Sequence, residues 1–103
     1  DILREALQDE RIRIAFVFGS IARGEEKAHS DVDLMVIGSI RLRPLSGLLS
    51  GVSQQIGREI NPHLLSEAEF KKRQNEKDHF LTRVMESPKV FIVGNQNDLS
   101  AMG

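Results

Sequence analysis

Two short stretches, Gly-Ser-Ile-Ala-Arg-Gly at residues 19–24 and Ser-Asp-Val-Asp-Leu at residues 30–34, stand at the ends of two apolar segments. The first stretch follows residues 12–18, whose β-branched and aromatic side chains predict a buried strand. The second opens residues 31–37, which begin with alternating residues and become uniformly apolar, as in a strand buried on both faces. Between the strands we expect a short helical turn and then a loop.

The pair Gly19-Ser20 has the composition of an anion-binding turn. Glycine lets the backbone come close to a ligand. Amide groups at the start of a helical turn, together with the hydroxyl group of Ser20, then form an anion site, for which phosphate is the expected ligand. On its own, a Gly-Ser pair usually marks only a turn.

Asp31 and Asp33 are two residues apart on a predicted strand, so their side chains share one face. The two positions are about 6.6–7 Å apart along the strand, and carboxylates this close repel each other unless a cation lies between them. Oxygen ligands suit Mg²⁺ or Mn²⁺. An isolated Asp-x-Asp is usually solvated or caps a helix, but its place beside a phosphate-binding turn indicates phosphoryl or nucleotidyl transfer.

The rest of the chain predicts further strands at residues 58–65 and 89–93. Because proline cannot donate to a ladder, Pro62 places the first of these at a sheet edge or leaves it paired on one side. An apolar stripe predicts one helix from Pro44 to Gly57.

Other helices are expected at the start of the chain, ending near Glu10, after the capping-box pair Ser66 and Glu69, and around residues 80–87. Residues from Gly94 onward are expected to form a short tail. The mixed order of elements predicts an α/β (α+β) fold, with a mixed sheet of about four strands flanked by helices.

Composition limits the classes of protein to which the chain can belong. A chain of 103 residues is expected to be a single domain, residues 1–103, and its start at Asp1 suggests a part of a longer protein. The absence of cysteine excludes disulfides and thiolate metal sites. No run approaches the roughly 18–20 apolar residues of a membrane helix, and no signal peptide is recognisable. We therefore expect a cytoplasmic protein without membrane contact.

The charge balance argues against a nucleic-acid-binding domain, because such domains are usually strongly basic and this chain has a net charge of −1 and a pI of about 6.3. Contact with DNA is expected only through a missing N-terminal domain. No Gly-Lys-Ser or Gly-Lys-Thr phosphate loop is present, which excludes the P-loop class.

The two motifs together resemble the signature of the polymerase-beta-type nucleotidyltransferase superfamily in its minimal bacterial and archaeal form. That signature is Gly-Ser, a small-Arg-Gly turn, a spacer and Ser-Asp-x-Asp-Leu, and each part is present here. Residues 57–62, 80–81 and 88–94 are similar to nucleotidyltransferase domains fused to winged-helix regulators in bacteria.

The resemblance implies a role for each matching residue. Gly19 and Ser20 would hold the β- and γ-phosphates of a nucleoside triphosphate, with ATP expected. Arg23 would neutralise phosphate charge, and Ser30 would also belong to the nucleotide site. Asp31 and Asp33 would be catalytic and ligate two Mg²⁺ (or Mn²⁺) ions. In related enzymes an acceptor hydroxyl attacks the α-phosphorus and pyrophosphate leaves.

Asn61 departs from the family pattern, in which a third carboxylate follows a Gly-Arg-x-apolar sequence on a later strand. An asparagine oxygen can ligate a metal, but it carries no charge and accepts no proton at neutral pH. General-base assistance is typically worth about 10²–10⁴ in rate, so its loss would impair catalysis. Glu59 and His63 share the predicted strand face of Asn61 and are the candidates to compensate.

The sequence leaves two hypotheses open. Either the domain is an active nucleotidyltransferase with an altered triad and an unidentified acceptor, or it is a nucleotide-sensing or protein-interaction module attached to a DNA-binding regulator. A resemblance to the nucleotidyltransferases of toxin–antitoxin pairs adds modification or masking of a partner protein. The nucleotide, the acceptor and the oligomeric state stay undetermined.

Histidines and phenylalanines carry no separate functional prediction. His29, His63 and His79 lack metal-ligand spacing and are expected at the surface or in capping roles. All five phenylalanines are expected in the core; they are Phe16, Phe18, Phe70, Phe80 and Phe91.

Overall fold

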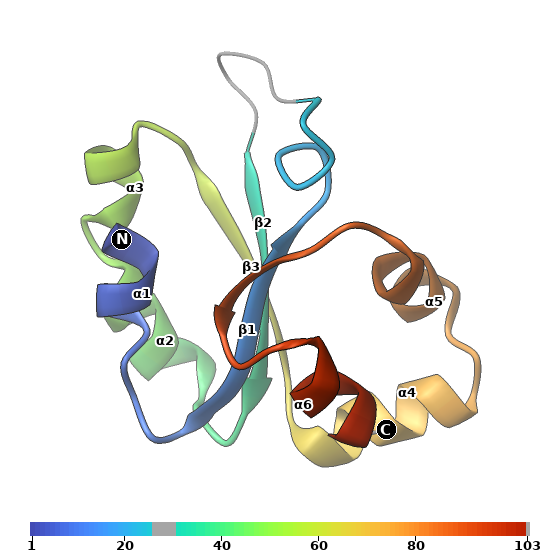
Figure 1. The fold of residues 1–103 in the computed structure, drawn as a ribbon. Helices are drawn as coiled ribbons and strands as arrows, with labels where there is room; N and C mark the ends of the chain where they lie inside the picture. Colours follow the sequence, from blue (N-terminus) through green and yellow to red (C-terminus); the bar gives the residue numbers. More distant parts are fainter. Residues whose placement is uncertain (26–30, 103) are drawn as a thin grey trace.

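A four-stranded mixed sheet forms the centre of the computed structural model, which describes residues 1–25 and 31–102 (Figure 1). The strands are β1 (Ile12–Phe18), β2 (Val32–Gly38), β3 (Ile60–Leu65) and β4 (Val90–Val93). They lie in the order β3-β2-β1-β4. β1 is antiparallel to β2 and β4, whereas β2 and β3 are parallel. The predicted fold class is therefore confirmed.

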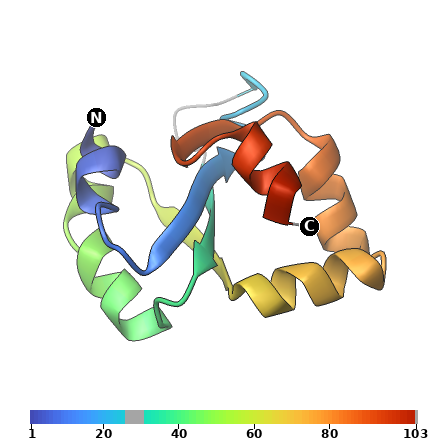
Figure 2. The same cartoon turned by 60° about the horizontal axis from the view of Figure 1, so that its bottom comes forward.

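Helices cover both faces of the sheet (Figures 1 and 2). One face carries α1 (Ile2–Ala6), α2 (Leu42–Leu49) and α3 (Val52–Ile56). The other face carries α4 (Glu67–Asn75), α5 (His79–Glu86) and α6 (Gln96–Met102). None of the helices in the described part of the chain is long and apolar enough to span a membrane.

Alternate residues of the central strands enter two separate cores. In β2, Leu34 and Val36 pack toward α1–α3, whereas Met35 and Ile37 pack toward α4–α6. All four are fully buried, as the uniformly apolar pattern predicted. Since odd-numbered residues of β2 face the α4–α6 layer, the side chain of Asp33 lies on that side of the sheet.

Pro62 lies in β3, and β3 is an edge strand of the described sheet. Its Cα is in register with that of Leu34, and the ladder to β2 continues on both sides of it. The prediction that this strand lies at an edge is confirmed. Proline is tolerated there because a residue of an edge strand can leave its outer side without an amide donor.

The single helix predicted from Pro44 to Gly57 is wrong, because the chain forms α2 and α3 with a break at Ser50-Gly51. Gly51 has φ +82°, a left-handed conformation that interrupts helical geometry. The apolar stripe survives the break, since Leu45, Leu49 and Val52 join one core.

Both ends of the chain also differ from the sequence prediction. The first helix ends at Ala6 instead of near Glu10, although Asp1 caps it as expected, accepting from the amide of Leu3 at 2.9 Å. The predicted tail after Gly94 is α6, in which Leu99 is fully buried. Tertiary burial stabilises a helix whose local sequence is only weakly apolar.

Candidate functional site

The turn after β1 presents Gly19 and Ser20 as the motif predicts. The amide of Arg23 donates to the carbonyl of Gly19 at 3.1 Å, and that of Glu25 donates to the carbonyl of Ser20 at 2.9 Å. These hydrogen bonds close a helix-like turn directly after the strand. Ser20 is therefore held at the start of a turn whose first amides have no partner within the turn itself.

Gly19 is required by its surroundings as well as by its backbone. Its φ is +78°, where a side chain is strained. A Cβ atom at this position would overlap the carboxylate of Asp33. Phe18 and Asp33 are neighbours in the β1–β2 register, so the turn after β1 and the carboxylate lie against each other.

Asp31, Asp33 and Asn61 gather where β2 and β3 begin. Asp33 and Asn61 are in register across the parallel ladder. The Asn61 side-chain amide donates to Asp31 Oδ2 at 3.2 Å. Asp31 lies one residue before β2, which begins at Val32 instead of at the predicted residue 31. The structure thus brings together the two carboxylates and the asparagine that stands in place of the third.

His63 joins this group, and its side chain, 38% exposed, is still partly at the surface as expected. Its Nε2 lies 4.0 Å from Asp33 Oδ1. Its ring centroid is 5.4 Å from that of Phe18 and 5.3 Å from that of Phe80. Side chains alternate along a strand with a period of two residues, so the place of His63 two residues after Asn61 indicates that both lie on the same face.

Glu59, the other candidate to compensate for Asn61, is less well placed. It precedes β3, and its carbonyl accepts from the Val32 amide at 2.8 Å. It lines a different hollow, together with Ile60, Pro62 and residues of α2 and α3. Ser30, predicted to bind nucleotide, lies outside the described residues, as does His29.

A hollow of about 410 Å³ opens beside Asp33, between the turn after β1 and α5. The contribution of α5, which lies far along the chain, was not predicted from the sequence. The lining residues are Phe18, Gly19, Ser20, Arg23, Asp33, Phe80, Arg83, Val84 and Ser87. The hollow therefore combines the turn at Gly19 and Ser20, a carboxylate, two guanidinium groups and two aromatic rings.

The two arginines of this hollow differ in their partners. Arg23 Nε lies 3.3 Å from Glu25 Oε2, and both side chains are well exposed. Arg83 lies in the last turn of α5, and no carboxylate within residues 1–25 and 31–102 forms an ion pair with it. Within that part of the chain, Arg83 is the cation of the hollow that is free to meet an anionic ligand.

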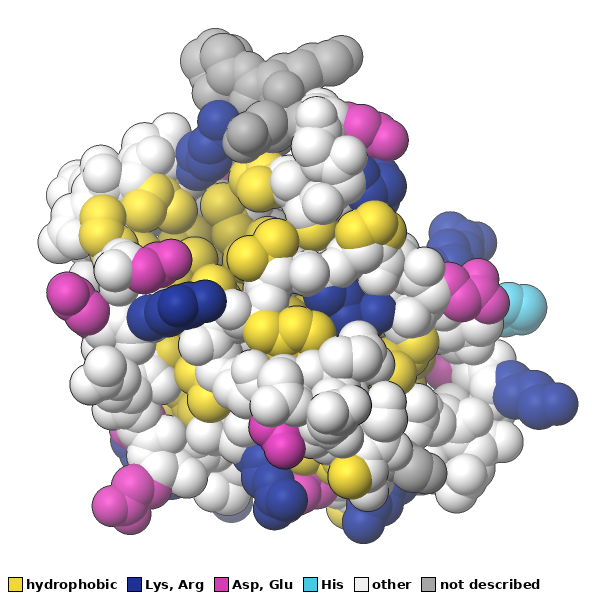
Figure 3. All heavy atoms as spheres, viewed as in Figure 1, with side chains coloured by type: hydrophobic (Ala, Val, Ile, Leu, Met, Phe, Trp, Pro, Cys, Tyr) yellow, Lys and Arg dark blue, Asp and Glu magenta, His cyan; other side chains and the backbone are white. Residues whose placement is uncertain are grey.

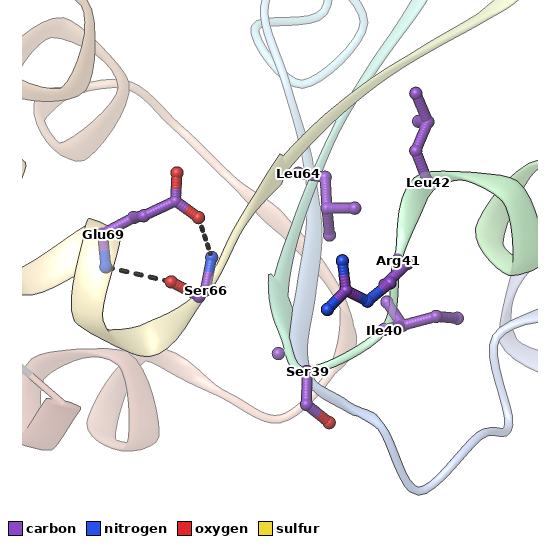
Figure 4. A pocket seen from close by; sticks show the side chains of 8 residues that line it. Ser39, Ile40, Arg41, Leu42, Leu64, Ser66 and Glu69 are labelled. Atoms are coloured by element: carbon purple, nitrogen blue, oxygen red, sulfur yellow. Dashed lines mark hydrogen bonds between the residues drawn. The ribbon is translucent and has the colours of Figure 1, made fainter.

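A second hollow, of about 430 Å³, lies at the other end of β2 (Figure 4). Among the described residues, neither an aromatic ring nor the turn at Gly19 and Ser20 lines it. Leu42 and Leu64 border it, and its one carboxylate from the described residues belongs to Glu69. That carboxylate accepts from the Ser66 amide at 3.0 Å, and Ser66 Oγ accepts from the Glu69 amide at 3.1 Å. The expected capping box of α4 is confirmed, so Glu69 serves to cap the start of that helix.

The family model described as "Polymerase beta, Nucleotidyltransferase" matches residues 1–97. The chain belongs to this nucleotidyltransferase family. The predicted resemblance is therefore confirmed over nearly the whole chain. This chain is also 32% identical, over 65 residues, to the "Putative protein adenylyltransferase MJ0604" of Methanocaldococcus jannaschii. That match covers 63% of this chain and 65% of the relative, so it spans slightly less than two thirds of the relative's length.

Solved toxin–antitoxin structures share the fold of this nucleotidyltransferase domain. A mutant of the toxin–antitoxin MntA-HpeT superposes with a TM-score of 0.63 at 14% identity, and a toxin–antitoxin with AMP-PNP with 0.61 at 16%. A tri-AMPylated HEPN toxin of Shewanella oneidensis in complex with MNT antitoxin gives 0.54 at 15%. These matches cover 98% of this chain and 74%, 74% and 71% of the matched chains.

The donor set of this nucleotidyltransferase domain fits a single divalent cation. Asp31 and Asp33 supply oxygen ligands and two negative charges, which one divalent ion balances. Asn61 adds no charge, and its amide is turned to donate to Asp31. Within the described residues, no three His, Cys, Asp or Glu side chains form a metal-binding group, so the charge for a second cation would have to come from substrate phosphates.

Proposed function

We propose that this nucleotidyltransferase domain binds a nucleoside triphosphate, ATP, together with Mg²⁺ or Mn²⁺, and transfers its nucleotide to an acceptor hydroxyl. The observation that carries the proposal is the contact of Gly19 with Asp33, because it sets a phosphate-binding turn against a cation-binding carboxylate. A phosphate site beside a carboxylate-held cation is the equipment of nucleotidyl transfer.

Each side chain of the hollow then has a role toward the triphosphate. The turn at Gly19 and Ser20 would bind the β- and γ-phosphates through amide and hydroxyl donors. Arg23 and Arg83 would neutralise their charge. Asp31 and Asp33 would hold the cation, which supplies charge stabilisation to the phosphate oxygens when bound.

The transfer forms one bond and breaks one. The acceptor oxygen bonds to the α-phosphorus while the bond from that phosphorus to the pyrophosphate oxygen breaks, and pyrophosphate leaves. The acceptor proton must pass to a base. Asn61 accepts no proton and Asp33 is assigned to the cation, so His63, whose Nε2 lies 4.0 Å from Asp33 Oδ1, is the candidate base.

A second candidate function is nucleotide binding with little or no turnover, in a domain that acts on or masks a partner protein. Asn61 favours it, since it stands in register with Asp33 at the position of the third carboxylate. The name of the archaeal relative and the titles of the toxin–antitoxin structures support a protein as acceptor or partner. On the face shown in Figure 3, basic and acidic side chains are interspersed, which favours a protein partner over nucleic acid.

Calorimetric titration of ATP and GTP, with and without Mg²⁺ or Mn²⁺, tests the binding site. Wild type should bind in a metal-dependent way, and Asp33→Asn and Asp31→Asn should abolish that dependence because the cation loses half of its ligand charge. Glu86→Gln, which removes an acidic charge from α5 without lining this hollow, is the matched control. Absence of triphosphate binding by wild type would contradict both candidate functions.

Turnover separates the two functions. ATP labelled at the α-phosphorus should leave its label on an acceptor protein if the domain is a transferase, and the label should be lost in Asp33→Asn. Tight metal-dependent binding without label on any protein of the native host would favour the binding module.

A further inference from the structure

Three rings from three elements meet beside the candidate cation site. Phe18 comes from β1, His63 from β3 and Phe80 from α5. The centroids of Phe18 and Phe80 are 6.0 Å apart in an edge-to-face arrangement. Those of His63 and Phe80 are 5.3 Å apart, with only 31° between the ring planes. Phe80 thus packs against the rings of both Phe18 and His63.

Phe80 is exposed, which corrects the expectation that all five phenylalanines are in the core. Its exposure is 39%, whereas Phe18 is 7% exposed. The helix itself is firmly seated, since Leu81 and Val84 of α5 are 1% and 3% exposed. The other large apolar side chains that are exposed in the described chain, Ile2, Leu42 and Val90, do not line this hollow.

We propose that Phe80 is the stacking surface for the base of the bound nucleotide, and that the base is a purine. The inference rests on the proposed function and adds the nucleoside end of the substrate to it. An exposed ring fixed by neighbouring rings loses little conformational entropy when a base stacks on it. A purine, with its two fused rings, covers more of such a surface than a pyrimidine does.

The geometry of the hollow supports one ligand that contacts both ends. Gly19 and Ser20 line it with donors for phosphate, and Arg83, one turn after Phe80 on α5, adds an uncommitted cation. Phe80 and Phe18 line the same hollow with apolar surface. A nucleotide has this division, since it is anionic at one end and an aromatic plane at the other.

The test compares ATP, UTP and inorganic tripolyphosphate by calorimetry in one Mg²⁺ buffer, with wild type, Phe80→Leu and Phe80→Trp. Stacking of a base on an aromatic ring corresponds to roughly a five- to hundredfold change in affinity. We expect Phe80→Leu to weaken ATP by that factor, UTP less and tripolyphosphate not at all, while Phe80→Trp keeps the affinity for ATP. Leu42→Ala, an exposed apolar residue 59% accessible at the far end of β2, is the control.

The outcomes distinguish this inference from the proposed function. ATP binding that Phe80→Leu leaves unchanged, or equal weakening of ATP and tripolyphosphate, would overturn the stacking role while leaving the phosphate and cation site intact. If wild type binds neither ATP nor tripolyphosphate, the proposed function fails and the inference fails with it.

Discussion

At the residue scale, the chemistry of this domain depends on a few close contacts around Asp33. Gly19 approaches its carboxylate from β1, Asn61 stands in register with it on β3, and His63 Nε2 lies 4.0 Å from it. Each neighbour changes what the carboxylate can do. Gly19 lets the turn after β1 come close, and Asn61 leaves the proposed site one charge short of the family pattern.

Replacement of Asn61 by aspartate should restore the missing charge. Without a divalent cation, Asn61→Asp should lower the melting temperature, since it loses the hydrogen bond to Asp31 and adds a third negative charge. With Mg²⁺ or Mn²⁺ the melting temperature should recover. The rate of nucleotide transfer should rise by about 10²-fold or more if the lack of a base limits the reaction in wild type. Thermal unfolding with and without metal measures the first effect, with Asn97→Asp on the exposed face of α6 as control. A melting temperature that does not respond to metal would show that Asn61 is not at the cation site.

Gly19→Ala tests the close approach to Asp33. The left-handed backbone should cost roughly 1–2 kcal/mol of unfolding free energy, and the overlap of the new methyl group with the Asp33 carboxylate should add to it and abolish nucleotide binding. Gly24→Ala is the matched control, because Gly24 has a similar φ of +74° but no atom of the described residues within 4 Å of where its methyl group would lie. Denaturant unfolding and ATP titration of both variants separate strain from overlap; equal binding by both would contradict the assigned contact.

At the scale of elements, α4 contributes to stability, whereas α5 both packs in the core and lines the hollow. Phe70 is the one buried residue of α4, so its N-terminal capping box is its main local support. α5 buries Leu81 and Val84, and its Phe80 and Arg83, with Ser87 directly after the helix, line the hollow. Its C-terminus is held by Lys89, whose Nζ donates to the carbonyls of Met85 and Ser87 at 2.8 and 2.9 Å. Desolvation lowers the pKa of Lys89.

Ser66→Ala should destabilise the domain by about 1 kcal/mol, the usual worth of an N-cap, with Ser46→Ala on the exposed face of α2 as control. The Ser66 amide lowers the pKa of Glu69 by donating to its carboxylate. Glu69 therefore contributes stability above its unfolded pKa, and this contribution is lost as pH falls through the lower folded value. Because Ser66→Ala keeps the Ser66 amide, the pH test needs a second variant, Glu69→Ala. Urea unfolding between neutral and acidic pH should show the difference between Glu69→Ala and wild type shrinking toward low pH. A difference that does not depend on pH would contradict the role of Glu69.

At the scale of the whole molecule, the sheet separates two layers of helices (Figure 2), each with its own core. The hollow beside Asp33 lies where the polar end of the sheet meets the α4–α6 layer. Fully apolar strand centres hold β1 and β2 rigidly in place. The strand ends carry the polar groups, so the site sits at the boundary between a packed sheet and solvent. α6 closes the second core through Leu99 and Met102.

Leu99→Ala should cost about 2–5 kcal/mol of unfolding free energy, because Leu99 is fully buried in the core that also holds α5. The exposed neighbour Asn97 provides the control substitution, Asn97→Ala. Chemical denaturation of both variants measures the effect. A loss below about 0.5 kcal/mol, the usual effect of a surface substitution, would show that α6 is not part of the folded core.

Local sequence determined the motif-bearing half of the site. Gly19-Ser20 and Asp31/Asp33 could be placed from sequence because strand periodicity and turn chemistry act over a few residues. The same periodicity put Asn61 and His63 on one face of their strand, and the motif spacing indicated the family. The four strands, the edge position of Pro62 and the capping box follow from equally local rules.

Only the tertiary structure decided which distant residues meet that motif. α5 is separated from Ser20 by most of the chain, and its Phe80 and Arg83 reach the hollow because Leu81 and Val84 pack beneath the sheet. The existence of α6 was likewise decided by packing, since its weakly apolar pattern does not specify a helix by itself. The break at Gly51 follows from its left-handed backbone. Burial acts between segments that are remote in sequence, so the nucleoside end of the site could be found only once the chain was folded.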